Sequence, residues 1–188
     1  MAGSGLDDAS PPEFLPTPRR ISVVATSSGA GKTTLARRLA EHYGLRHVEL
    51  DSLHHLPGWQ PAPDFEARVA AEVGEAGWVI DGNYHGRLRG MVTDAADLVI
   101  WLDLPIAVCL ARMCRRTARR IARREVLWNG NRETFRNAVL ARDGLFRFTL
   151  ATYGERRRVM PDRLAGRPYV RLRSQAEVDA WVAANLTP

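Results

Sequence analysis

Short apolar runs alternate with amphipathic segments along the chain from residue 20 onward. Apolar runs of strand length lie at 20–25, 46–50, 77–81, 97–103 and 168–172. Runs of this length with polar borders predict strands that are buried on both faces of a sheet. The segments between most of these runs carry apolar residues at helical spacing. We therefore expect strands and helices to alternate along the chain.

The helices are predicted from their apolar spacing and from their ends. Helical spacing is present at 32–43 and from Phe65 to Val73. Pro105 begins a long helical region that ends at about residue 124, because a helix tolerates a missing N–H at its first residue. A second helix is expected from about Arg132 into the 140s. Ser174-Gln-Ala-Glu177 is a capping box that opens the last helix.

This alternation predicts one α/β domain, a three-layer, doubly wound parallel sheet with ligands at the carboxyl ends of its strands. We assign it to residues 19–188, after a leader at residues 1–18 that is rich in Gly, Ser and Pro. The 188 residues, 45% of them hydrophobic and 26% charged, are typical of a globular protein. Because no apolar run approaches roughly eighteen residues, no membrane span is expected, and a cytoplasmic location is the simplest interpretation.

A glycine-rich segment, Thr26-Ser-Ser-Gly-Ala-Gly-Lys-Thr-Thr34, follows the first strand and opens a helix. This is the context of a P-loop, or Walker A motif, which binds the phosphates of a nucleoside triphosphate such as ATP. Lys32 is the only lysine among 27 Lys and Arg residues, and we expect it to contact the β- and γ-phosphates. The Thr33 hydroxyl is expected to bind Mg²⁺. The predicted phosphate-binding residues are Ser27, Ser28, Gly29, Ala30, Gly31, Lys32, Thr33 and Thr34. Thr26 stands where the motif has glycine.

Three aspartates follow predicted strands, and phosphoryl transfer needs carboxylates both for magnesium and for the acceptor. Asp81 ends the apolar run Trp78-Val-Ile-Asp81, and we assign it to the Mg²⁺ shell. Asp51 ends the second strand and is predicted to orient the acceptor; the reverse assignment of these two residues is the alternative. Asp103 is expected to be structural and to help start the next helix.

Further acceptor-binding candidates lie close to these aspartates in sequence. His54 follows Asp51 on the same strand-end loop, and could equally be a surface histidine. Trp59 could equally be a packing residue. Gly82 is expected to allow close approach of a substrate. The full set of predicted substrate-binding residues is Asp51, His54, Trp59, Gly82, Asn83, Tyr84 and Arg87.

Seven arginines and no acidic residue lie between Leu104 and Arg124. On a helical wheel they centre opposite the apolar side that includes Met113 and Thr117. An unpaired cationic face is stabilised by a nearby anion, so we predict that Arg112, Arg115 and Arg116 neutralise the transferring phosphate. A solvated helix face and a nucleic-acid-binding surface are the alternatives.

The chain resembles the adenylate-kinase-like P-loop proteins that are often labelled DNA topology modulation proteins. The likeness extends over residues 20–186 and is carried by Ser27–Thr34, Glu49–His55, Pro57–Gln60, Trp78–Tyr84, Leu98–Pro105 and Trp128–Glu133. It implies a nucleoside-kinase-like fold with a helical, arginine-rich lid at roughly residues 112–135. It also implies that Arg173-Ser-Gln175 lies near the adenine.

Two features of this resemblance bear on the acceptor. Nucleoside monophosphate kinases typically have Asp-Gly-Phe-Pro-Arg after the third strand, whereas this chain has Asp81-Gly-Asn-Tyr-His85, with Arg87 nearby. Asp51-x-x-His54 is similar to the acceptor loop of gluconate-type kinases, in which a carboxylate positions a hydroxyl.

The predicted function is therefore an ATP- and Mg²⁺-dependent phosphotransferase that acts on a small molecule at a hydroxyl. An adenylate-like nucleoside monophosphate kinase is one alternative. A nucleic-acid-associated protein that binds ATP with slow or no turnover is the other. It is not favoured, because few aromatic residues lie within the basic segments.

Overall fold

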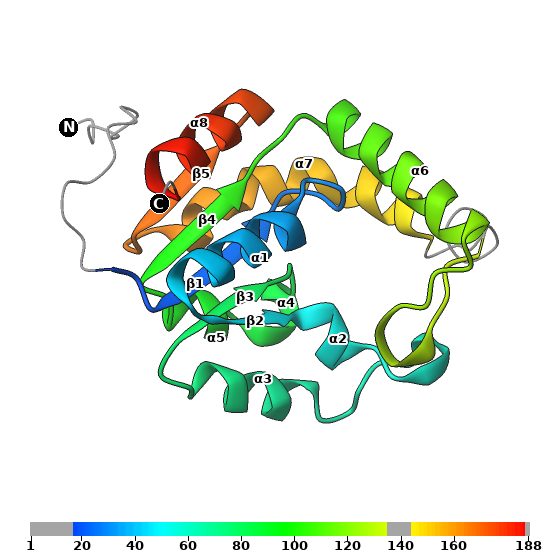
Figure 1. Cartoon of the computed structure of the whole chain (residues 1–188), viewed down its shortest axis with the longest axis horizontal. Helices are drawn as coiled ribbons and strands as arrows, with labels where there is room; N and C mark the ends of the chain where they lie inside the picture. Colours follow the sequence, from blue (N-terminus) through cyan, green and yellow to red (C-terminus); the bar gives the residue numbers. More distant parts are fainter. Residues whose placement is uncertain (1–16, 135–143, 187–188) are drawn as a thin grey trace.

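The centre of the molecule is a five-stranded parallel sheet with the strand order β2-β3-β1-β4-β5 (Figure 1). The structure is a computed structural model that describes residues 17–134 and 144–186. The strands are β1 (Arg20–Ala25), β2 (Arg46–Glu49), β3 (Trp78–Asp81), β4 (Leu98–Leu102) and β5 (Tyr169–Leu172). From β1 the chain first forms β2 and β3 on one side of this strand, and then β4 and β5 on its other side. The loop after β1 therefore lies at the switch point, where such sheets bind ligands.

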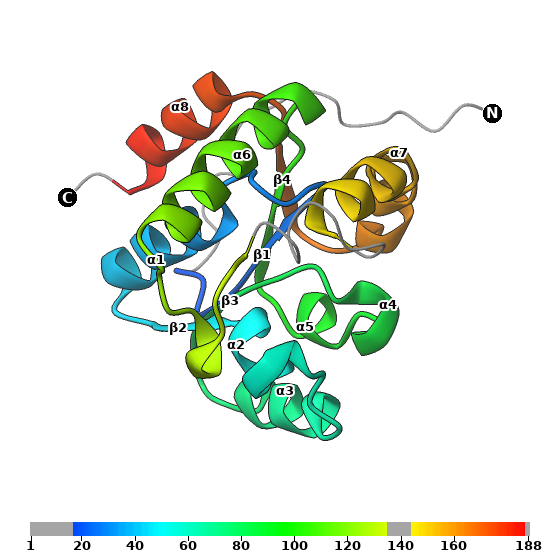
Figure 2. The same ribbon diagram turned by 90° about the vertical axis from the view of Figure 1, so that its right-hand side faces the viewer.

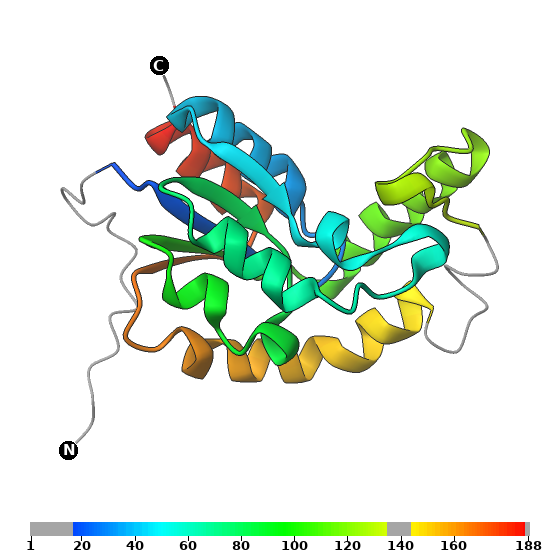
Figure 3. The same cartoon turned by 90° about the horizontal axis from the view of Figure 1, so that it is seen from below.

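Helices cover both faces of the sheet (Figures 2 and 3). One face carries α1 (Lys32–Tyr43) and α8 (Gln175–Asn185). The opposite face carries α3 (Phe65–Val73), α4 (His85–Leu88), α5 (Met91–Asp94) and α7 (Leu145–Leu164). Two further helices, α2 (Leu50–His54) and α6 (Ile106–Ala122), follow β2 and β4. Short 3₁₀ turns, η1 (Pro57–Trp59) and η2 (Trp128–Gly130), complete the described elements.

The alternation of side chains along β1 explains the two-sided core. Ile21 and Val23 are fully buried and pack with α1 and α8. Val24 points to the opposite face, where it packs with Met160 and Leu164 of α7. A third cluster, which includes Phe65 of α3, fills the same face beneath β2 and β3. Burial on both sides is what makes the strand segments continuously apolar.

The predicted α/β fold class and all five predicted strands are confirmed, as is the helix after Pro105. The helix predicted from about Arg132 is wrong for residues 132–134, because Arg132 pairs with Val126 in an antiparallel bridge. Its continuation at residues 135–143 lies outside the described residues, as do residues 1–16 of the predicted leader and residues 187–188. Among the residues described, no helix has the length and apolarity needed to cross a membrane.

Candidate active site

The P-loop connects β1 to α1 at the carboxyl edge of the sheet (Figure 1). Gly29 (φ +81°) and Gly31 (φ +99°) lie in the left-handed region, which favours glycine. A Cβ at Gly29 would also lie only 2.4 Å from the carbonyl oxygen of Cys109, in the first turn of α6. The loop is therefore packed tightly under the start of α6, and a side chain at position 29 would displace one of them.

Lys32 opens α1 and lies among charged groups from four other elements. Burial lowers the pKa of its ammonium, while the carboxylates of Asp81 and Asp51 oppose this shift. The guanidiniums of Arg116 and Arg156 lower the pKa further. The structure thus brings together the lysine, both predicted aspartates and one of the predicted arginines. Arg156, on α7, was given no role in the site by the sequence.

Asp81, at the end of β3, connects the P-loop with β2. Its Oδ1 accepts a hydrogen bond from the Thr33 hydroxyl at 3.3 Å, and its Oδ2 lies 2.8 Å from Nε2 of His47. A hydroxyl beside a carboxylate is the type of oxygen donor set that magnesium prefers. No group of three or more His, Cys, Asp or Glu in the described part of the chain could hold a metal by itself. Phosphate oxygens and water would have to complete the coordination, as is usual for Mg²⁺.

Strand β2 ends at Glu49, so Asp51 lies in the first turn of α2 rather than at the end of the strand. The Tyr84 hydroxyl donates a hydrogen bond to Asp51 Oδ1 at 2.7 Å. Burial, together with the Asp51 carboxylate, raises the pKa of Tyr84 strongly, so Tyr84 remains a donor. One oxygen of Asp51 is therefore fixed by a neutral hydroxyl group.

Arg87 and His54 pack against an aromatic cluster next to Asp51. The His54 ring centroid lies 4.7 Å from that of Tyr84. Arg87 Nη1 lies 3.1 Å from Nε2 of His54, and burial lowers the pKa of His54, so a neutral imidazole accepts this bond. Arg87 also donates to Glu66 Oε1 at 2.6 Å and to the carbonyl of Ala62 at 3.2 Å. Its guanidinium is thus already well satisfied within the protein.

Two predicted acceptor residues, Gly82 and Asn83, are occupied by contacts within the fold. Leu50, rather than a substrate, takes the space beside Gly82, since a Cβ there would lie 2.6 Å from Cβ of Leu50. The Asn83 side chain accepts a hydrogen bond from the backbone N–H of Ala25 at 2.9 Å. It therefore ties the end of β3 to the start of the P-loop.

Residues 126–132, called the lid tip below, are docked on the loop that contains Trp59. The backbone N–H of Trp59 donates to Asn131 Oδ1 at 2.9 Å, and Asn131 Nδ2 donates to the carbonyl of Leu56 at 2.9 Å. Asn131 is only 3% exposed. Figure 1 shows the yellow-green segment that contains η2 beside the cyan segment that contains η1.

Two neighbouring side chains of the lid tip add to this docking. Asn129 Nδ2 donates to the carbonyl of His55 at 2.5 Å and to that of Ser52 at 3.2 Å. Trp128 Nε1 donates to Glu49 Oε2 at 3.1 Å. The sequence motif that contains these residues was recognised, but nothing in it indicated which segment they contact.

The arginines of α6 divide into an inner and an outer row. Arg112 Nη2 donates to Gln175 Oε1 at 2.6 Å, and its Nη1 lies 4.0 Å from the Cβ position of Gly31. Arg116 is partly buried, and burial lowers its pKa; its Nε has no hydrogen-bond partner among the described residues. Arg115 is exposed. The arginines therefore do not share one environment, since Arg112 and Arg116 turn toward the P-loop while Arg115 is exposed.

Comparisons with known proteins agree with this architecture. The chain is 33% identical over 118 residues to a cytidylate kinase of Pyrococcus horikoshii, a match that covers 54% of this chain and 60% of the relative. The chain thus matches less than two thirds of that relative's length. No protein-family model matches the sequence.

Solved structures of kinases share the fold at low sequence identity. The shikimate kinase of Acinetobacter baumannii, solved with shikimate, superposes with a TM-score of 0.53 at 15% identity, over 90% of this chain and 96% of that chain. A gluconokinase of Sinorhizobium meliloti gives a TM-score of 0.52 at 18% identity, over 90% and 94%. This chain therefore has the α/β fold of the P-loop kinases.

Proposed function

We propose that this protein is an ATP- and Mg²⁺-dependent phosphotransferase that phosphorylates a small molecule at a hydroxyl. The observation that carries the proposal is the convergence on Lys32 of Asp81, Asp51 and the inner arginine Arg116. Phosphoryl transfer depends on positioning and on charge stabilisation rather than on covalent chemistry of the protein. A lysine, two acids and an arginine from a neighbouring helix, placed around a P-loop, are the groups that this reaction needs.

Each group has a distinct role in the proposed reaction. The loop from Ser27 to Thr34 binds the triphosphate, with the Lys32 ammonium between its β- and γ-phosphates. Thr33 and Asp81 would hold Mg²⁺, which supplies charge neutralisation on the phosphates when bound. Arg112 and Arg116 approach from α6 and neutralise the negative charge on the transferring group. Arg115 is exposed on α6, and we assign it no contact with the transferring group.

Asp51, which lies close to Lys32, orients the acceptor. Tyr84 holds one carboxylate oxygen, and the other accepts a hydrogen bond from the acceptor hydroxyl. The acceptor oxygen then forms a bond to the γ-phosphorus while the bond to the bridging oxygen of ADP breaks, and the hydroxyl proton passes to Asp51. Tyr84 thereby fixes the direction in which this carboxylate presents its second oxygen.

The state of Arg87 favours a hydroxyl acceptor over a phosphate acceptor. A phosphate would have to displace Glu66, His54 or a backbone carbonyl from this guanidinium. Because these partners already satisfy the guanidinium, a phosphate would gain less from Arg87 than from an arginine without such bonds. The similarity to a cytidylate kinase favours the second candidate, a nucleoside monophosphate kinase, in which Arg87 would exchange these partners for the acceptor phosphate.

The test is ADP release from Mg·ATP with two pools of acceptors, one of sugar and sugar-acid hydroxyl compounds and one of nucleoside monophosphates. Stimulation by the hydroxyl pool, lost in Lys32→Ala, is the expected result. Arg87→Gln should then leave the KM for the acceptor nearly unchanged. Stimulation by nucleoside monophosphates, with a KM raised by Arg87→Gln, would replace the first candidate with the second. No stimulation by either pool would reject both.

The nucleic-acid alternative keeps one structural observation in its favour. Arg115, Arg119 and Arg123 are exposed on the outer row of α6, and no ion pair involves them within the described residues. Binding to DNA or RNA through such a row would weaken steeply as salt rises. Turnover of a small acceptor would change little over the same range.

A further inference from the structure

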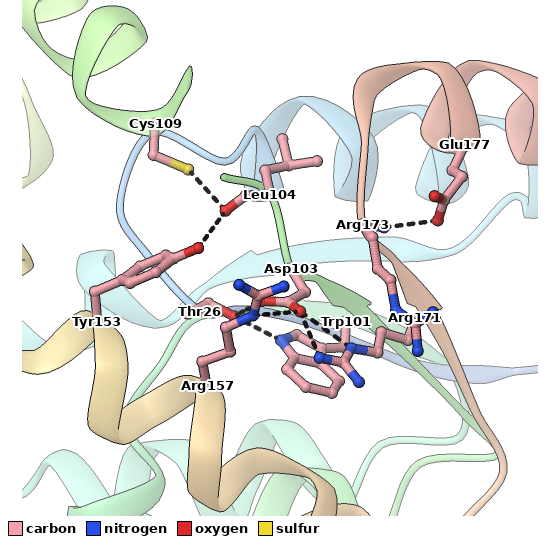
Figure 4. A network of polar contacts seen from close by, with 10 residues as sticks. All are labelled: Thr26, Trp101, Asp103, Leu104, Cys109, Tyr153, Arg157, Arg171, Arg173 and Glu177. Atoms are coloured by element: carbon pink, nitrogen blue, oxygen red, sulfur yellow. Dashed lines mark hydrogen bonds and ion pairs between the residues drawn. The ribbon is translucent and has the colours of Figure 1, made fainter. Parts of the chain in front are cut away.

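Thr26 occupies the first position of the P-loop, where the motif has glycine, and its hydroxyl lies in a buried polar network (Figure 4). The hydroxyl donates to Asp103 Oδ1 at 2.7 Å and accepts from Trp101 Nε1 at 2.9 Å. The backbone N–H of Thr26 also donates to the carbonyl of Leu102 at 3.1 Å. Because Thr26 is only 1% exposed, water cannot replace these bonds readily.

Asp103 follows β4 directly and is completely buried. Its Oδ2 accepts from Arg171 of β5 at 2.7 and 3.1 Å and from Arg157 of α7 at 3.1 Å. The Arg171 guanidinium also lies 4.2 Å from the ring centroid of Trp101. The two carboxylate oxygens therefore divide their partners, with Oδ1 bound to the P-loop and Oδ2 bound to two cations. A buried carboxylate is tolerated only with such pairing.

A second contact holds α7 at the same point. The Tyr153 hydroxyl donates to the carbonyl of Leu104 at 3.1 Å (Figure 4). Tyr153 lies one helical turn before Arg157, so two successive turns of α7 are attached to the residues that follow β4. Figure 4 shows α7, β4 and β5 meeting at this network. The first residue of the P-loop is thus bonded to a junction of three elements.

We propose that Thr26 and Asp103 are positioning residues for the triphosphate, and that the Thr26 hydroxyl sets the start of the P-loop in place of the usual glycine. The proposal rests on the proposed function only in placing a triphosphate in this loop. A glycine at position 26 would add backbone freedom. It would also leave the Asp103 Oδ1 and Trp101 Nε1 atoms without their partner, which is costly for buried groups. In this chain, the glycine of the motif should therefore be the inferior residue.

The test is the affinity for Mg·ATP of three variants, measured by calorimetry at a temperature where circular dichroism shows each to be folded. Thr26→Ser keeps the hydroxyl and should bind ATP within about twofold of the wild type. Thr26→Val keeps the shape without the hydroxyl, and Thr26→Gly gives the motif residue. Both should bind about tenfold more weakly, which corresponds to about 1.4 kcal/mol. In turnover, they should raise the KM for ATP and leave that for the acceptor unchanged.

Arg157→Gln provides a second route to the same network. It should also weaken ATP binding. The double variant with Thr26→Val should bind ATP with the same affinity as the single variant that binds it less tightly, because both substitutions act through Asp103. Arg158→Gln is the matched control, since Arg158 is an exposed neighbour on α7. It should bind ATP as the wild type does.

Several results would overturn the proposal. One is a Thr26→Gly variant that binds ATP as tightly as the wild type. Another is a set of variants that melt at lower temperature but bind ATP unchanged, since that describes a structural role alone. If the fold losses of ATP affinity caused by Thr26→Val and Arg157→Gln multiply in the double variant, the link through Asp103 is also rejected. If the wild-type protein binds ATP but phosphorylates no acceptor, the proposed function is rejected and this inference stands. If the wild-type protein does not bind ATP, both are rejected.

Discussion

The two sides of the candidate site are built in different ways. The nucleotide side is one contiguous segment, residues 26–34, fixed between a buried strand and a helix. The acceptor side combines residues 49–60, residues 82–87 and the lid tip. The hydrogen bonds between the lid tip and residues 49–60 join positions 72–79 apart, and the bond between Tyr84 and Asp51 joins positions 33 apart. A loop with its own motif can be recognised by itself, whereas an assembled surface depends on the whole fold. Substitutions should therefore separate the two sides.

The sharpest separation is expected at Asp51. Asp51→Asn removes the carboxylate that receives the acceptor proton, and should lower kcat by about 10³-fold. The Kd for ATP should stay within about twofold, because the P-loop is intact. Lys32→Ala is the contrasting variant and should lose ATP binding itself. Rapid-quench kinetics and calorimetry on the two variants measure both quantities, and a matching loss of ATP affinity in Asp51→Asn would contradict the division.

The next largest effect concerns the two rows of arginines on α6. Arg116→Gln removes a partly buried guanidinium next to Lys32 and should lower kcat/KM by about 10²-fold. Arg115→Gln, on the exposed row, should change it by less than about twofold. Steady-state kinetics on this matched pair decides whether the inner row alone serves the reaction. Equal losses in the two variants would show that α6 turns in the reacting complex.

Acid should act on the acceptor side through His85, which is partly buried there. Burial lowers the pKa of His85 to about 4, against an ordinary value of 6.5. Between these values the unfolded chain binds the additional proton, so stability is fully present above pH 6.5 and falls as the pH decreases toward 4. For His85 the loss at about pH 5 is on the order of 2 kcal/mol. Urea unfolding at pH 7 and 5 measures it, and His85→Gln should flatten the dependence. An unchanged slope in that variant would assign the effect to other groups.

The smallest effect is expected at the lid tip. Asn131→Ala removes the hydrogen bonds to Trp59 and Leu56. It should raise the KM for the acceptor about tenfold, the equivalent of about 1.4 kcal/mol, and leave the Kd for ATP unchanged. Arg123→Gln, at an exposed position before the lid tip, is the control. A rise in the Kd for ATP instead would mean that the lid tip serves the nucleotide side.

The sequence allowed the strands and the P-loop to be predicted because their signals are local. Continuous apolar runs identify strands that are buried on both faces, and Gly29, Gly31 and Lys32 identify the loop within nine residues. The helix α7 was missed over most of its length. Pro161 lies within it, and its apolar residues do not follow a single face, because its two ends contact different parts of the molecule.

The acceptor side could be predicted only in part, for physical reasons. Asp51 and Tyr84 were identified from their positions after strands, but their hydrogen bond depends on the pairing of β2 with β3. The division of the arginines depends on the rotation of α6 about its axis. Neighbours in sequence differ by about 100° around a helix, so Arg116 is partly buried beside the apolar stripe while Arg115 is exposed.

The absence of a Cβ at Gly29 lets the carbonyl of Cys109 approach the P-loop closely, which fixes the start of α6 above that loop. From Cys109 to Ala122 the helix extends for about 20 Å, at about 1.5 Å per residue. The lid tip begins four residues after Ala122, the last residue of α6. One continuous helix therefore sets the spacing between the P-loop and the loop around Trp59, and a substitution that shortens or bends α6 changes that spacing without touching either segment.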